Sequence, residues 1–86
     1  MNVYRIDFRP GARREFNKLA PKVKSRLQPH IDGLAENPRP PGCKKLHGGE
    51  NLWRIRGGDY RIIYEIHDDV LVVVVVKVGN RRDVYR

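Results

Sequence analysis

Three arginines in the second half of the chain are spaced so that a β-hairpin would gather them on one face. Arg54 and Arg56 alternate with apolar residues, and alternate side chains of a strand share a face. The short Gly-Gly-Asp connection at 57–59 is typical of a hairpin turn, which brings Arg61 back onto the arginine face. Three guanidinium groups on one small patch repel each other, but each matches the geometry of a phosphate group. The spacing therefore predicts a phosphate-binding surface.

The composition supports an anionic partner for this surface. The 86 residues include 18 lysines and arginines against 10 aspartates and glutamates, which gives a formal net charge of +8. A nucleic acid, an anionic membrane or an acidic protein would each exploit such a field. We expect a single domain over residues 1–86, because a chain of this length has room for one core only.

The sequence lacks the usual features of exported and membrane proteins. A single cysteine, Cys43, rules out an internal disulfide and is typical of a reducing compartment. No signal peptide is visible, and the longest apolar run, 70–76, is too short to span a bilayer. We therefore expect a cytoplasmic protein with no membrane partner. Cys43 and His47 have too few companions for zinc, so we expect no metal and no cofactor.

Two helical segments follow one strand in the first half of the chain. Residues 3–8 alternate as a half-buried strand does. Apolar residues then recur at helical spacing after Pro10 and again after Pro21, which predicts a helical hairpin. Pro29 lies inside the second pattern and predicts a kink or break near that position.

The second half of the chain is β-rich. A proline-rich loop at 37–42 precedes it, and the expected strands cover 52–56, 60–66 and 69–78. The valine run at 72–76 predicts a strand that is covered on both faces or lies in the sheet centre. The order β-α-α-β-β-β predicts a small α+β domain, an antiparallel sheet with the helical hairpin packed on one face.

Four segments of this chain, in this order and spacing, resemble the RelE/ParE superfamily of toxins from type II toxin–antitoxin pairs. They read Lys-Leu-His-Gly at 45–48, Trp-Arg-Ile-Arg at 53–56, Tyr-Arg-Ile-Ile-Tyr at 60–64 and Val-Gly-Asn-Arg-Arg-Asp-Val-Tyr at 78–85. The resemblance covers essentially the whole chain and implies a RelE-like fold. It also implies one of two activities. RelE-type members are ribosome-dependent endoribonucleases that cut mRNA in the decoding site, whereas ParE-type members poison DNA gyrase.

The resemblance carries a ribonuclease site onto five positions. Arg61 matches the arginine after the hairpin, Arg81 the arginine of the C-terminal motif, and Tyr85 the aromatic residue that stacks on a base near the cut. Arg54 and Arg56 fall where the best-studied ribonucleases of this type carry two lysines, one of which has been given the role of proton abstraction. These arginines depart from the family pattern. An arginine stays protonated and is a poor general base, so the residue that abstracts the proton is in question. The expected RNA-binding residues are Lys44, Lys45, Arg54, Arg56 and Arg82.

The implied reaction needs no bound metal, because the RNA 2′-hydroxyl beside the scissile phosphate is an internal nucleophile. Arg61 and Arg81 are predicted to stabilise the phosphorane, and Arg54 and Arg56 to hold flanking phosphates. Tyr85 would stack a base or support proton transfer to the leaving group. The titratable candidates for a general base are His47, Glu50, Glu65 and His67, and the sequence does not select among them.

Three functions stay open on the sequence. The first is a ribosome-dependent mRNA interferase, the second is a gyrase inhibitor without nuclease activity, and the third is a non-toxic module that binds its antitoxin. A cognate antitoxin with an acidic or amphipathic segment is the expected partner in all three cases. The ribosome, through its rRNA, and mRNA are further partners in the first case, and operator DNA is reached only through the antitoxin.

Overall fold

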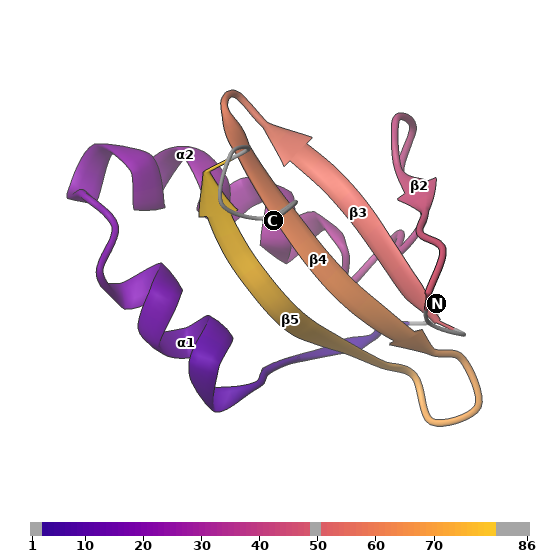
Figure 1. Cartoon of the computed structure of the whole chain (residues 1–86). Helices are drawn as coiled ribbons and strands as arrows, with labels where there is room; N and C mark the ends of the chain where they lie inside the picture. The colour runs from indigo at the N-terminus through magenta and orange to yellow at the C-terminus, as the bar shows by residue number, and fades with distance from the viewer. Residues whose placement is uncertain (1–2, 49–50, 81–86) are drawn as a thin grey trace.

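The computed structural model describes residues 3–48 and 51–80, which form two helices and five strands (Figure 1). The α+β fold expected from the sequence is confirmed, with the helices between the first strand and the others. One strand, β2, was not expected, because it is only two residues long. The elements are β1 (Arg5–Phe8), α1 (Pro10–Asn17), α2 (Pro21–Gly33), β2 (Lys44–Lys45), β3 (Leu52–Gly57), β4 (Tyr60–His67) and β5 (Val72–Asn80).

The sheet has the strand order β1-β5-β4-β3-β2. Strands β2 to β5 pair antiparallel with their neighbours, as expected. Strand β1, in contrast, pairs parallel with β5, so the sheet is mixed and the expectation of a wholly antiparallel sheet was wrong at this edge. The chain between these two strands contains both helices and strands β2 to β4, and it is long enough to return in the same direction. Parallel neighbours require such a connection.

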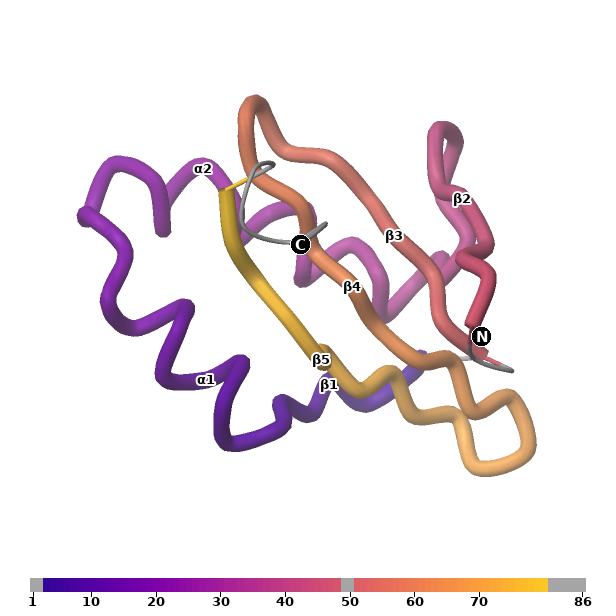
Figure 2. Tube along the Cα trace, in the orientation of Figure 1, coloured from indigo at the N-terminus to yellow at the C-terminus, as the bar shows by residue number. Residues whose placement is uncertain are grey.

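Both helices begin with a proline and pack an apolar stripe into the core. Pro10 and Pro21 stand at the starts of the helices, where the missing proline N–H has no helical partner to lose. Figure 2 shows α2 behind the sheet and α1 beside β5. Ala12 and Phe16 are the buried residues of α1. The helices thus leave the opposite face of the sheet without a helical cover among the described residues.

The expected break near Pro29 is absent, because α2 continues through this residue to Gly33. Leu27 and Ile31 lie on either side of the proline in sequence, and both are fully buried in the core. Their packing holds the helical path although Pro29 offers no N–H to the ladder.

The valine-rich strand β5 lies inside the sheet, between β1 and β4, as expected. Val73 and Val75 face the helices and are fully buried, while Val72 and Val74 point to the other face and are half-buried. The continuous valine run therefore reflects a strand that is partly covered on both sides.

The loop after α2 is fixed to the sheet by polar contacts. The buried Tyr64 hydroxyl donates to the Pro38 carbonyl oxygen at 2.7 Å. Arg39 pairs with Asp68 at 2.8 Å, and the Tyr4 hydroxyl donates to the same carboxylate at 2.6 Å. The Arg39 guanidinium also lies 5.0 Å from the centre of the Trp53 ring. These contacts tie the loop to the hairpin that joins β4 and β5.

Candidate functional site

The register of β3 and β4 places the three arginines on one face of the sheet. Arg56 is directly opposite Arg61, and Arg54 is two residues along β3, opposite Ile63. Directly opposite residues share a face, so the predicted clustering is confirmed. Their neighbour Ile55 points the other way into the core, which makes the arginine face the one turned away from the helices.

The hairpin turn is closed by glycines for two separate reasons. Gly58 has a φ of 61°, a conformation that favours glycine, and it stands first in the two-residue turn as in type II′ hairpins. Gly57 instead lies against α2, where a Cβ built on it would come within 2.5 Å of Leu27 Cδ2. Gly58 therefore fixes the register of the arginines, and Gly57 allows β3 to lie close to α2.

The three arginines differ in exposure. Arg54 and Arg61 retain only 7% and 6% of their accessible surface, whereas Arg56 is exposed. A guanidinium group stays protonated even when buried, so the two buried side chains place fixed positive charge inside the sheet face. The exposed Arg56 is free to adjust to a ligand. The site thus combines two positioned cations with one adaptable cation.

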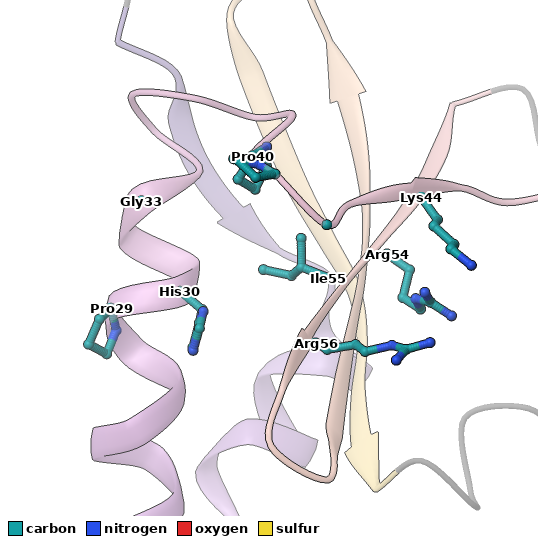
Figure 3. A pocket seen from close by; sticks show the side chains of 10 residues that line it. Pro29, His30, Gly33, Pro40, Lys44, Arg54, Ile55 and Arg56 are labelled. Carbon is teal, nitrogen blue, oxygen red and sulfur yellow. The ribbon is translucent and has the colours of Figure 1, made fainter.

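Lys44 extends this row of cations to a third strand. It is directly opposite Arg54 on β2, and Figure 3 shows Lys44, Arg54 and Arg56 pointing to the same side of β3. Lys45 is different, because it is opposite Trp53 and its Nζ lies 6.0 Å from the centre of that ring. The alternation of the strand puts it on the other face, so the structure separates Lys45 from the residues expected to bind RNA with it.

Three predicted site residues, Arg81, Arg82 and Tyr85, lie outside the described part of the chain, and their roles stay predictions. The described part of β5 ends close to the arginines. Gly79 is directly opposite Arg61, and Asn80 follows opposite Tyr60.

The two candidate general bases on β4, Glu65 and His67, do not lie beside the arginines. Glu65 and His67 share the face of Arg61, but they are four and six residues farther along β4, about 13 and 20 Å away at strand spacing. Glu65 accepts hydrogen bonds from His67 and Arg9, each at 3.0 Å, and the His67 contact is the main cause that lowers its pKa. His47 is exposed in the turn after β2, and Glu50 lies outside the described residues.

A groove at the outer edge of β3 was not anticipated from the sequence. It has a volume of about 550 Å³ and lies between α2, the loop after it and β3 (Figure 3). No single motif marks it, because residues of α2, of the loop after it and of β3 line it together. It is lined by Pro29, His30, Gly33, Pro40, Pro41, Gly42, Lys44, Arg54, Ile55 and Arg56.

Other kinds of site find no support in residues 3–48 and 51–80. Over these ranges, no three histidine, cysteine or carboxylate side chains gather as a metal site would require. Neither helix has the length and apolar character needed to cross a membrane.

The sequence of the chain matches a family model over residues 6–85. That model describes the ParE toxin of the type II toxin–antitoxin system parDE. The chain belongs to this toxin family. Two relatives are named as toxins RelE and RelG. The mRNA interferase toxin RelE of Escherichia coli K12 is 34% identical over 81 residues, which cover 92% of this toxin and 84% of the relative. Toxin RelG of Mycobacterium tuberculosis is 31% identical over 84 residues, covering 96% and 97%.

Solved structures of RelE toxins have the same fold. RelE in the intact E. coli RelBE toxin–antitoxin complex matches with a TM-score of 0.79 and 32% identity, over 91% of this toxin and 96% of that chain. The RelBE2 complex of M. tuberculosis matches with a TM-score of 0.82 and 30% identity, over 94% of both chains. The fold and the sequence both place this toxin in the RelE/ParE superfamily.

Proposed function

We propose that this toxin is a ribosome-dependent endoribonuclease that cleaves mRNA in the decoding site. The observation that carries the proposal is the placement of Arg54, Arg56 and Arg61 on one face of adjacent strands, with Arg56 directly opposite Arg61. Relatives named mRNA interferase support it at 34% identity. A cytoplasmic location follows from the substrate.

The chemistry starts from the RNA itself. The 2′-hydroxyl oxygen attacks the adjacent phosphorus, a P–O2′ bond forms, and the bond from phosphorus to the 5′-oxygen of the next nucleotide breaks. The attacking hydroxyl loses a proton and the leaving oxygen gains one. Catalysis therefore depends on alignment and on stabilising the doubly charged phosphorane.

The buried Arg61 suits the stabilisation of the phosphorane. Arg61 is held in place by its burial, so its charge needs little reorganisation as negative charge develops on phosphorus. We assign the phosphorane oxygens to Arg61 together with Arg81. Arg54 and Arg56 would hold flanking phosphates, and Tyr85 would stack a base or assist the leaving oxygen.

Among the described residues, the arginine face offers no evident group to abstract the proton from the 2′-hydroxyl. Arginines stay protonated, and Glu65 and His67 lie too far along β4 to reach a phosphate held by Arg61. We infer that ribosomal RNA supplies orientation that the protein lacks, so that free RNA is cut far more slowly than mRNA on the ribosome.

The site assignment is tested by expressing the double variant Arg61→Ala/Arg81→Ala and following growth. We expect relief of the growth arrest caused by the unmodified toxin. The circular dichroism spectrum and binding of the cognate antitoxin should be retained, which shows that the fold is intact. Full toxicity of the folded double variant would contradict the assignment.

A cognate antitoxin is the proposed protein partner. Several related RelE toxins are seen in complex with RelB. For this toxin we infer an antitoxin encoded beside it whose acidic or amphipathic segment neutralises part of the +8 charge, and which alone contacts operator DNA. Affinity for the antitoxin should fall as salt is raised from about 0.05 to 0.5 M, because screening weakens charge pairing. A salt-independent affinity would contradict a mainly electrostatic contact.

Inhibition of DNA gyrase is the second candidate function. The matched family model describes a ParE toxin, and arginines replace the two lysines expected in a RelE ribonuclease. This candidate predicts loss of supercoiling activity by purified gyrase in the presence of the toxin, with translated mRNA left intact.

A further inference from the structure

The groove beside β3 exposes the backbone of that strand. Strand β2 pairs with β3 only at Lys44–Arg54 and Lys45–Trp53, so the described structure has no strand opposite residues 55–57 on this edge. Leu46 N–H donates to the Leu52 carbonyl at 2.8 Å, which shows that the main-chain groups of Leu52 point to this edge. By the two-residue alternation of an antiparallel ladder, those of Arg56 point the same way, into the groove.

The groove has proline rings and His30 on one side and cations on the other. Pro40 and Pro41 come from the loop, and Pro29 and His30 from α2. The His30 ring packs on the turn, since a Cβ built on Gly57 would lie 3.3 Å from His30 Cδ2. Figure 3 shows the side chains of Lys44, Arg54 and Arg56 on the far side of β3 from His30. The edge of β3 therefore lies between the cations of the groove and its proline and imidazole rings.

We propose that this groove binds the base of a nucleotide next to the cleaved bond. The proposal rests on the proposed function. The nucleotide phosphate lies on Arg54 and Arg56, and its sugar crosses the edge of β3. Its base then enters the groove between the prolines and His30. A volume of about 550 Å³ is within the range of pockets that hold small ligands, and proline and imidazole rings suit a flat heterocycle.

The backbone of Arg56 gives this groove a means to distinguish bases. One N–H and one C=O on the same strand residue offer a donor and an acceptor side by side. The edge of a base carries donors and acceptors in patterns that differ from base to base. His30 and Arg56 would therefore determine which base is preferred beside the cut.

An extended peptide is the other ligand that open strand edges bind, and the geometry argues against it here. Strand addition depends on several consecutive main-chain hydrogen bonds. Only residues 55–57 lack an outer neighbour in the described structure, and Arg56 alone among them directs its main-chain groups outward. The turn at Gly58 and the pairing of Lys44 with Arg54 bound this stretch at its two ends.

The test is a map of cut positions on several translated mRNAs for the unmodified toxin, His30→Ala and Pro41→Ala. Gln28→Ala is the matched control, because Gln28 is exposed on the same helix and does not line the groove. Thermal melting verifies that each variant is folded. If His30→Ala does not fold, Pro41→Ala alone tests the groove. We expect the base preference beside the cut to fall about fivefold or more in both groove variants, as for one lost stacking contact. Gln28→Ala should keep the original preference.

The outcomes separate this inference from the function on which it rests. If the unmodified toxin cuts but the groove variants keep its base preference, the base subsite is wrong and the proposed function stands. If the same variants instead weaken binding of the antitoxin, the groove belongs to a protein partner. If the unmodified toxin cuts no mRNA, both proposals fail together.

Discussion

Arg56 and Arg61 are directly opposite each other on one sheet face, yet one is exposed and the other almost fully buried. Neutralising them should therefore have different consequences. A buried arginine keeps one orientation and can be aimed at charge that develops only in the transition state. An exposed arginine has many rotamers and contributes chiefly to holding a phosphate that is charged throughout. At the scale of the residue, the difference in burial within this opposed pair assigns transition-state stabilisation to Arg61 and phosphate binding to Arg56.

We predict that Arg61→Gln lowers the rate of mRNA cleavage at saturating ribosome concentration about 100-fold or more, as for loss of one preorganised donor. Arg56→Gln should chiefly raise the ribosome concentration needed for half-maximal rate. Arg5→Gln is the control, since Arg5 is on β1 and pairs with Asp7 at 3.0 Å. Single-turnover cleavage over a range of ribosome concentrations measures both quantities. An equal fall of the saturated rate in the Arg56 and Arg61 variants would refute this division of roles.

At the scale of the element, the site depends on how the loop and the hairpins are fixed to the sheet. The site strand β3 is set against α2 by Gly57, and the loop at 37–42 is set against the β4–β5 hairpin by Arg39 and Asp68. Each attachment can be removed by a single substitution away from the arginines. Such variants test the scaffold apart from the chemistry.

Gly57→Ala should destabilise the fold by about 1–3 kcal/mol, because the added methyl group would meet Leu27 Cδ2 at 2.5 Å in a packed core. Gly11→Ala is the matched control, since a Cβ there has no neighbour within 4 Å and alanine favours helix. Urea unfolding of both variants measures the difference in free energy. A stability equal to that of Gly11→Ala would show that β3 and α2 are not in close contact.

The Asp68 contacts predict a stability change in acid. The hydrogen bond from Arg39, followed by that from Tyr4, lowers the pKa of Asp68 from 3.8 to about 2. Because the folded pKa lies below the unfolded value, this contribution is complete above about pH 4 and is lost as the pH falls towards 2. Asp68→Asn should lack this component, so its urea midpoint should decline less than that of the unmodified toxin between pH 4 and 2. Parallel declines would mean that the contact does not form in solution.

At the scale of the whole molecule, the sequence predicted what depends on alternation and missed what depends on distant segments. The shared face of Arg54, Arg56 and Arg61 follows from strand periodicity and a short turn, both of which are local. The parallel pairing of β1 with β5 could not be read in this way, because residues 3–8 would alternate identically in either direction. The burial of Arg54 and Arg61 could not be predicted either. Strand periodicity shows which face a side chain is on, but it does not show what covers that face.

The groove beside β3 could not be predicted from the sequence either, because it depends on how separate segments pack together. His30 stands in a helical pattern with no motif around it, and only the folding of α2 against the hairpin turn brings it to Gly57. The helix does not break at Pro29 for a related reason, since its low helix propensity is outweighed by the packing of the buried Leu27 and Ile31. A net charge of +8, in contrast, is a property of the composition and needed no structure.

The central claim, that this toxin cuts mRNA on the ribosome, is tested most directly by primer extension on an mRNA translated in vitro. The reaction is run with the toxin, without it, and with the toxin on the same mRNA in the absence of ribosomes. We predict cuts within codons at the decoding site only when ribosomes and toxin are both present. Intact mRNA in a reaction whose toxin still binds its antitoxin would contradict the account and favour gyrase as the target.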